Sequence, residues 1–379
     1  MSRDRLAGAR GRDLTDIVAD RHVIVCTGSG GVGKTTSAAA LALSAAHQGR
    51  RTIVLTIDPA KRLAQSLGLS ALDNNPRPVK GADGLDAMML DMKRTFDEVI
   101  DRHASDAQRA ARIKTNRFYQ QLSNSLAGTQ EYMAMEKLYD LHNAGEYDCI
   151  VIDTPPTRNA LDFLDAPKRL TDFLEGRFLR MFLAPGLAAG KIATRAAGFG
   201  AGLFMKAASR LTGQAVLSDL AEFFQSFEGM YDGFKQRAQA VYRLLQSPSS
   251  AFVVVASPEE PALREARYFL QRLAQDGMPT AGLVVNRVTL PPPGALESLS
   301  PQEARAAAAR LDDGVDAGVV AELLRLHADR LGVTKRERRA IAAAMHGINP
   351  RVLVEVPLMD SDVHDLDDLR AIATHLVGA

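Results

Sequence analysis

A glycine-rich run that ends in lysine and threonine is the part of this sequence best suited to chemistry. Residues 28–35 match the phosphate-binding pattern G-x-x-x-x-G-K-S/T at every fixed position. The glycines let successive backbone N–H groups turn toward phosphate oxygens. Lys34 would reach the β- and γ-phosphates of a nucleoside triphosphate, and the Thr35 hydroxyl would ligate magnesium. The residues expected to bind the nucleotide are Gly28, Ser29, Gly30, Gly31, Val32, Gly33, Lys34, Thr35 and Thr36.

Two aspartates could complete a magnesium site. Asp58 and Asp153 each follow an apolar, strand-like run directly. A carboxylate at the end of a strand can hold magnesium, the usual second acidic element of such sites. A turn or helix cap is the alternative for Asp153. For Asp58, which precedes a proline, an ordinary turn is an equal alternative on pattern alone. The candidate metal ligands are thus Thr35, Asp58 and Asp153.

Short β-branched runs alternate with longer helical patterns along the chain. Such apolar strands, joined by helical crossovers, predict a doubly wound, mostly parallel α/β sheet covered on both faces. Ligands of these folds bind at the carboxyl ends of the strands, where the phosphate loop and both aspartates fall. The expected strands are His22–Cys26, Arg51–Ile57, Leu85–Leu90, Asp148–Ile152, Ala251–Ala256, Thr280–Val285 and Val352–Val356.

Two intervals between these strands are too long for simple crossovers, and both have helical patterns. We interpret them as inserts that form a helical subdomain beside the nucleotide. A further helical stretch, Ser300–Gly347, follows a proline-rich break and predicts a peripheral hairpin. The expected organisation is a P-loop core of residues 22–92, 146–160 and 248–366, helical inserts of residues 93–145 and 161–247, and an N-terminal extension of residues 1–21.

Composition narrows the function classes. The 379 residues are 46% hydrophobic and 24% charged, as in globular proteins, and the formal net charge of +1 provides no overall field to attract nucleic acid. Cys26 and Cys149 are expected to be buried, inert thiols because they lie in apolar runs. No secretory signal and no uninterrupted apolar stretch of about 20 residues is present. These features predict a cytoplasmic protein, at most peripheral to a membrane.

The motifs together resemble the arsenical pump-driving ATPase family, which includes the ATPases that target tail-anchored membrane proteins. The resemblance extends from about Val23 to Leu366. Thr56–Ala60 is similar to the family's first switch, which implies that Asp58 positions the attacking water and acts as the base, with Lys34 as the other catalytic residue. Asp153–Thr157 is similar to the second switch. The resemblance therefore implies an ATPase that uses ATP and Mg²⁺.

Three later positions extend the resemblance. Asn286, in Val284–Arg287, is similar to the asparagine that reads adenine, and Pro357 to the loop that closes over the base. Glu265 resembles a glutamate that contacts nucleotide across a dimer interface. The absence of the guanine-reading N-K-x-D pattern favours ATP over GTP. The family's architecture implies a homodimer, or a heterodimer with a paralogous ATPase.

The sequence departs from the family at three places. Ser29 stands where the family usually has a lysine that reaches the partner's phosphates, and a neutral serine cannot supply that charge. A homodimer should then hydrolyse ATP slowly, unless Lys61 or Arg62 substitutes or a lysine-bearing paralogue is the partner. Arg158–Ala160 replaces the family's Gly-His-Thr after the second switch. The inserts contain no cysteine, so the soft ligands for arsenite or antimonite are missing.

An apolar and basic stretch in the second insert indicates a candidate surface for partners. Gly176–Ser218 contains no Asp or Glu and is rich in Phe, Met, Leu and Gly. Such a stretch suits a mobile surface for a hydrophobic client segment or a membrane. Plain amphipathic helices packed on the body are the alternative. A nucleic-acid patch is a less favoured interpretation.

These features favour a dimeric ATP-driven switch that handles a hydrophobic protein segment or couples to a membrane partner. A regulatory subunit that binds ATP but barely hydrolyses it, paired with a lysine-bearing paralogue, is the first alternative. A partition or division-site ATPase is the second. Such relatives bind DNA through basic residues or membranes through a C-terminal amphipathic helix, and the acidic start of residues 360–379 does not favour either.

Overall fold

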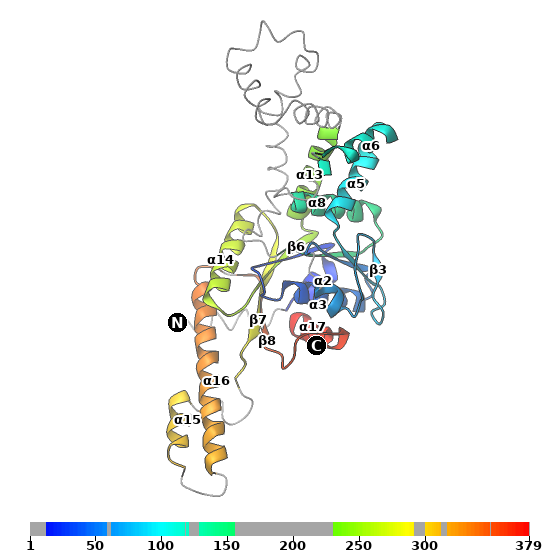
Figure 1. The fold of residues 1–379 in the computed structure, drawn as a ribbon. Helices are drawn as coiled ribbons and strands as arrows, with labels where there is room; N and C mark the ends of the chain where they lie inside the picture. The colour runs from blue at the N-terminus through cyan, green and yellow to red at the C-terminus, as the bar shows by residue number, and fades with distance from the viewer. Residues whose placement is uncertain are drawn as a thin grey trace, which may run out of the picture.

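The computed structural model describes residues 13–58, 62–117, 119–120, 129–155, 230–291, 300–311, 317–348 and 350–378. Lys61, Arg158–Ala160 and the acid-free stretch Gly176–Ser218 lie outside this part of the chain. The described residues form one eight-stranded sheet with helices on both faces, which confirms the predicted doubly wound α/β fold (Figure 1). The strands are β1 (Val23–Thr27), β2 (Thr52–Thr56), β3 (Arg77–Pro78), β4 (Leu85–Met89), β5 (Cys149–Asp153), β6 (Ser250–Ala256), β7 (Thr280–Val288) and β8 (Leu353–Pro357).

The strand order in the sheet is β3-β4-β2-β5-β1-β6-β7-β8. Each described pair is parallel except β3 with β4, where Arg77 lies opposite Ala87 in an antiparallel ladder. The sequence did not predict β3, because a strand of two residues is too short to show the alternation of apolar and polar side chains. β1 lies between β5 and β6, and all its residues are buried, as are those of β2, β5 and β6. Their continuous apolar runs are the expected signature of strands covered on both faces.

Alternate side chains of the strands pack into two separate cores. Val23 and Val25 face one core, while Ile24 and Cys26 face the other. Both cysteines are fully buried, as the sequence predicted. The second core lies under α2 (Thr15–Asp20), α3 (Lys34–His47), α4 (Arg62–Ser66) and α17 (Leu366–Val377). The first core lies under α5 (Met92–His103), α6 (Ala107–Thr115), α8 (Thr129–Ala144), α13 (Tyr231–Gln246), α14 (Glu260–Gln275) and α16 (Ala317–Ala344).

The described part of the N-terminal extension is packed against the core. Leu14, Ile17 and Val18 are buried beside α3 and α17. The backbone N–H of Leu14 donates to the carbonyl oxygen of Leu376 over 2.8 Å, which joins the two ends of the described chain. Residues from Asp13 onward are therefore part of the folded body.

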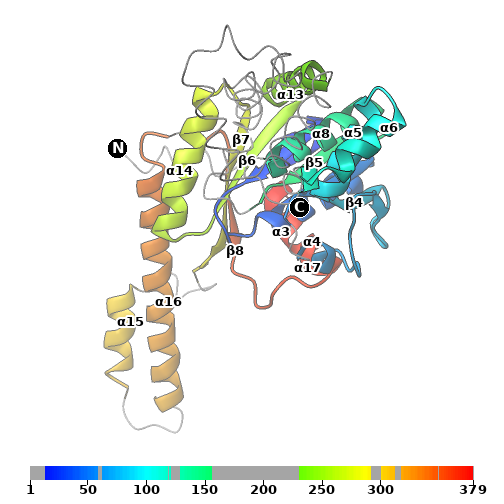
Figure 2. The same ribbon diagram turned by 45° about the horizontal axis from the view of Figure 1, so that its top comes forward.

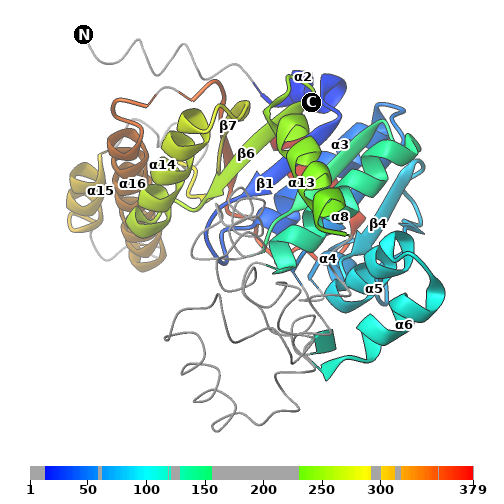
Figure 3. The ribbon, with the colours of Figure 1, turned by 90° about the horizontal axis from the view of Figure 1, so that it is seen from above.

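The helices α5, α6, α8 and α13 form a group at one end of the molecule, and α8 and α13 lie side by side (Figures 2 and 3). A buried ion pair joins α8 to α13. The Nε of Arg237 donates to Oε2 of Glu136 over 2.7 Å, and these side chains are 9% and 1% exposed. The Tyr132 hydroxyl also donates to Glu136, and the Arg237 guanidinium lies 5.1 Å from the centre of the Phe234 ring. The two buried charges are therefore paired with each other, although Nη2 of Arg237 has no hydrogen-bond partner among the described residues.

A helical hairpin extends from the body, as the sequence predicted (Figure 1). α15 (Pro301–Ala308) begins with a capping box made by Ser300 and Glu303, and α16 runs back along it. The carboxylate of Glu337 on α16 accepts hydrogen bonds from the backbone N–H and hydroxyl of Thr289, which fixes the hairpin to the end of β7. None of the helices in the described ranges is long and apolar enough to cross a membrane.

The buried pair between α8 and α13 generates a stability prediction. Substitution of Arg237→Leu leaves the Glu136 carboxylate buried without its cation, and burial already raises the pKa of this carboxyl. We expect the free energy of unfolding to fall by about 3–5 kcal/mol. The measurement is urea unfolding followed by circular dichroism.

A matched control is the exposed pair of Arg305 and Asp329, whose side chains are 61% and 66% exposed. Substitution of Arg305→Leu should cost less than about 1 kcal/mol. The double variant with Glu136→Leu and Arg237→Leu should recover most of the lost stability, because it leaves no unpaired buried charge. Equal losses in the Arg237 and Arg305 variants would contradict the assignment.

Candidate nucleotide site

The phosphate loop connects β1 to α3, and glycine is required at two of its positions by close contacts. A side chain at Gly28 would place its Cβ 2.0 Å from the carbonyl oxygen of Val255. Gly33 has a φ of +97°, and a Cβ there would lie 2.1 Å from Nδ2 of Asn286. The backbone carbonyl of Val255 cannot move away from a side chain at Gly28, and the positive φ of Gly33 is strained for any residue with a side chain, so the curled path of the loop favours glycine at both positions.

Lys34 lies at the N-terminus of α3 with its side chain bent over the loop. Its Nζ donates to the carbonyl oxygen of Ser29 over 2.7 Å, and the residue is 6% exposed. Burial lowers the pKa of the ammonium, while the charges of Asp153 and Asp58 act in the opposite direction. The ammonium is thus held within the curl of the loop, where an incoming phosphate oxygen could replace the carbonyl.

Asp153 is the buried centre of the site. Its Oδ2 accepts hydrogen bonds from the hydroxyls of Thr35, over 2.8 Å, and Thr56, over 2.9 Å. The register of the sheet makes this possible, because β5 lies between β1 and β2 and pairs Asp153 with Cys26 on one side and Thr56 on the other. Burial raises the pKa of the Asp153 carboxyl to about 6, although the two hydroxyl hydrogen bonds lower it.

The second oxygen of Asp153 supports the expectation of a metal. Oδ1 is buried and has no hydrogen-bond partner among the described residues. A carboxylate oxygen of this kind, next to the Thr35 hydroxyl, suits a hard cation such as Mg²⁺. The described residues contain no cluster of three or more His, Cys, Asp or Glu side chains that could hold a metal. A magnesium ion here would therefore depend on nucleotide phosphates for its remaining ligands.

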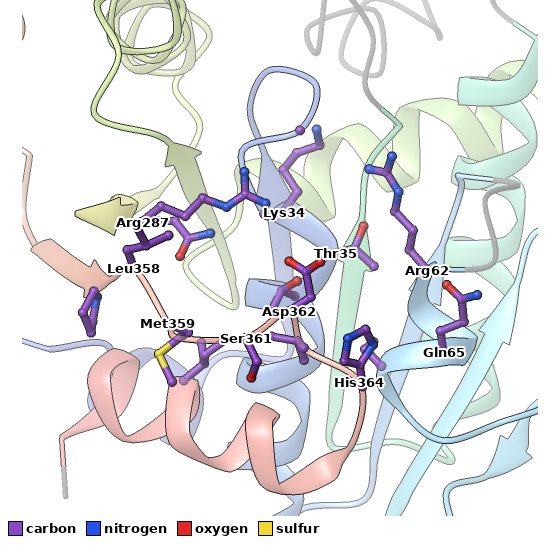
Figure 4. Close-up of a pocket in the computed structure, with 18 of the residues that line it drawn as sticks. Lys34, Thr35, Arg62, Gln65, Arg287, Leu358, Met359, Ser361, Asp362 and His364 are labelled. Atoms are coloured by element: carbon purple, nitrogen blue, oxygen red, sulfur yellow. The ribbon is translucent and has the colours of Figure 1, made fainter. Parts of the chain in front are cut away.

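A cavity of about 740 Å³ opens beside the loop (Figure 4). The sequence-predicted residues Asp58, Thr36, Asn286 and Pro357 line it together with Lys34 and Thr35. They come from the start of α3, the turn after β2, the last part of β7 and the end of β8. Further lining residues are Gly31, Gly33, Arg62, Gln65, Ser66, Thr154, Arg287, Leu358, Met359, Asp360, Ser361, Asp362, Val363, His364 and Ile372.

A second cavity of about 450 Å³ lies on the other side of the loop. Ser29, Gly30 and Val32 line this cavity, and so does Glu265 of α14. The structure therefore separates Glu265 from the cavity that holds Lys34 and places it with Ser29. A contact of Glu265 with a nucleotide in another subunit remains a prediction.

Asn286 ties the end of β7 to the phosphate loop. Its Nδ2 donates to the carbonyl oxygen of Val32 over 3.0 Å, and the residue is 9% exposed. The same amide group occupies the space that a side chain at Gly33 would need. The contact gives Asn286 a role in holding the loop. Its predicted reading of adenine is not tested by this geometry.

Sequence reasoning missed two contributors to the site. Arg287 lines both cavities and has a φ of +63°, a conformation that costs a non-glycine residue about 1–2 kcal/mol. Residues 359–364, which continue the loop that begins at Pro357, form a wall of the larger cavity, and no pattern in the sequence indicated how far this loop extends along it. For Arg287 the available signal was its position directly after Asn286.

A further missed contact joins the site to the helical group. Nε2 of Gln130, in the first turn of α8, donates to the carbonyl oxygen of Ile57 over 2.7 Å. Ile57 directly precedes Asp58, so the backbone of the expected first switch is bonded to α8. No local pattern connects residues so far apart in sequence.

Comparisons with known proteins cover most of the chain. A family model described as anion-transporting ATPase matches residues 21–305. ATPase GET3 of Malassezia globosa is 28% identical over 274 residues, which cover 72% of this chain and 74% of that protein. ATPase get3 of Schizosaccharomyces pombe is 26% identical over 266 residues, or 70% and 73% of the two chains. An uncharacterised protein of Streptomyces coelicolor is 31% identical over 276 residues, or 70% and 62%.

The burial of Asp153 generates a pH prediction. The carboxyl has a pKa of about 6 in the folded chain, against 3.8 for an ordinary aspartate. Between these values the folded chain binds a proton that the unfolded chain has released, so the stabilising contribution is present below about pH 4 and is lost as the pH rises through 6. The difference is about 3 kcal/mol. Substitution of Asp153→Asn should remove this part of the pH dependence.

The measurement is urea unfolding of the nucleotide-free chain at pH 4.5 and pH 7.5. The control is Asp329→Asn, which changes an exposed carboxylate on the hairpin and should keep the wild-type dependence. If wild type and Asp153→Asn lose the same stability between the two pH values, then Asp153 is not the titrating group.

Proposed function

Because the chain belongs to the anion-transporting ATPase family and is therefore an ATPase, we propose that it is a dimeric switch that couples its nucleotide state to a hydrophobic protein segment or a membrane partner. The observation that carries the coupling is the hydrogen bond from Gln130 to the carbonyl oxygen next to Asp58. Through this contact a change in the backbone at Asp58 would be transmitted to α8, a helix of the proposed partner-binding region.

The proposed chemistry assigns roles to the residues at the phosphate end of the site. Lys34 would bind the β- and γ-phosphates, and Asp58 would act as the base that positions water. Thr35 and Asp153 would hold Mg²⁺, which when bound neutralises charge that develops on the phosphates. The support is the placement of Lys34, Thr35 and Asp58 around one cavity, together with the unpartnered Oδ1 of Asp153, whose other carboxylate oxygen accepts a hydrogen bond from Thr35. Asn286 and Pro357 would contact the adenine.

Two contacts hold helix α8 of the proposed partner-binding region in place. α8 is bonded to Ile57 at its N-terminus, and its middle is held to α13 by the buried pair of Glu136 and Arg237. The acid-free stretch Gly176–Ser218 belongs to the segment between β5, which ends at Asp153, and α13. Nucleotide-dependent changes at Asp58 or Asp153 would thus act on both ends of the helical region. We place the client or membrane surface there, in a cytoplasmic protein.

A slow or non-hydrolysing regulatory subunit remains the second candidate, and Ser29 favours it. Ser29 and Glu265 line the second cavity. Among the described residues that line this cavity, Arg287 is the only basic one. Arg62 lines the nucleotide cavity and is exposed, which supports it as a substitute for the missing lysine. The partition-type alternative has no such support, because Leu369, Ile372 and Leu376 bury the apolar face of the C-terminal helix α17.

The client proposal is tested with a fluorescent peptide of about 20 apolar residues. We expect its affinity for the full chain to differ about 5-fold or more between the ATP and ADP states. Substitution of Gln130→Ala should reduce this difference without a change in ATP affinity, because it removes only the contact with Ile57. Fluorescence anisotropy of the peptide gives its affinity in each nucleotide state, and isothermal calorimetry gives the ATP affinity. A polar peptide of equal length is the control, and no peptide binding in any nucleotide state would remove the client proposal.

The role of Ser29 is tested by turnover. Substitution of Ser29→Lys should raise kcat by about 10-fold or more if a missing cation limits hydrolysis. Ser29→Met supplies similar length without charge and should leave kcat at the wild-type value. A phosphate-release assay measures both. Rapid turnover by the wild-type chain alone, with no gain from Ser29→Lys, would end the regulatory-subunit alternative.

A further inference from the structure

Arg287 has a backbone conformation that is costly for any residue with a side chain. Its φ of +63° lies in the left-handed region, and no other non-glycine residue in the described ranges has a positive φ. The pairing of β7 with β8 shifts register between Val285 and Val288, so Arg287 stands at a break in the ladder. Glycine would adopt this conformation without steric strain. Strain of this kind, next to a cavity, indicates that the side chain has a function.

The position of Arg287 places it at the tip of the phosphate loop. Two residues line both the nucleotide cavity and the second cavity, namely Arg287 and Gly31. Because Gly31 is part of the loop that would hold the phosphates, the arginine lies on the phosphate side of the cavity. In Figure 4 the side chains of Arg287 and Arg62 lie on opposite sides of Lys34 and Thr35.

The guanidinium of Arg287 is available to a ligand. The residue is exposed at the end of an otherwise buried strand, and its side chain makes no hydrogen bond or ion pair with the residues that the structure describes. Glu259 and Glu265 line the same second cavity without pairing with it. A planar guanidinium is always charged and presents donors in a geometry that fits phosphate oxygens.

We propose that Arg287 binds the terminal phosphates of ATP, as a second cation beside Lys34. The inference rests on the proposed binding of ATP in this cavity. The end of β7 then has two roles. Asn286 holds the phosphate loop by a hydrogen bond to Val32, and Arg287 places its positive charge beside the tip of the loop. The alternative is that Arg287 has a purely structural role at the end of β7.

The test compares Arg287→Gly with Arg287→Lys. Glycine relieves the strain and removes the charge, so the melting temperature should stay at the wild-type value or rise, while the affinity for ATP with Mg²⁺ falls about 10- to 100-fold. The loss should be smaller for ADP and absent for AMP, because the terminal phosphates are the proposed contact. Arg287→Lys should retain part of the ATP affinity. Isothermal calorimetry and thermal unfolding supply the measurements.

The matched control is Arg336→Gln, which removes an exposed arginine of α16 that lines neither cavity. It should bind all three nucleotides as the wild type does. Unchanged ATP affinity in Arg287→Gly, while Lys34→Ala abolishes binding, would overturn this inference alone. An equal loss for AMP, ADP and ATP, or a fall in melting temperature with the loss, would overturn it in favour of a base contact or a structural role. A wild-type chain that binds no ATP would overturn both proposals.

Discussion

The carboxylate of Asp153 is the constraint on which the rest of the site depends. It is buried at the end of a central strand, where two hydroxyl hydrogen bonds and the nearby charge of Lys34 offset only part of the cost of its desolvation. These bonds exist because β5 lies between β1 and β2, so that the phosphate loop and the first switch begin at the ends of the two strands that flank β5. A different strand order would leave the carboxylate uncompensated. Burying this carboxylate costs folding free energy. The cost is explained if the carboxylate serves as a ligand for a cation.

The sequence predicted what is encoded locally. Continuous apolar runs predicted the parallel strands, and the fixed spacing of the glycines and Lys34 predicted the phosphate loop. The sequence could not predict contacts between distant segments, such as the hydrogen bonds from Gln130 to Ile57 and from Asn286 to Val32. It also could not give the left-handed backbone of Arg287, because arginine has no preference for that conformation and the register shift with β8 imposes it.

The molecule combines two kinds of attachment. The helical group is held by the buried ion pair of Glu136 and Arg237, whose hydrogen bond from Nε to Oε2 links α13 to α8. The nucleotide side is held by single hydrogen bonds to backbone carbonyls, at Ile57 and Val32. Single bonds of this type are each worth about 1 kcal/mol and can be exchanged at small cost. The arrangement joins a stiff helical unit to a loop region that ligand contacts can rearrange.

The two cysteines also decide how such rearrangements can be observed. Cys26 and Cys149 are the only thiols in the chain, and both lie at full burial within central strands. Burial raises the pKa of both, to about 11 for Cys149, so neither forms a thiolate readily at neutral pH. The folded wild-type chain is therefore a ready background for spectroscopic labelling. A single cysteine introduced on the hairpin or on α5 would carry a maleimide dye alone, with no native thiol to remove first.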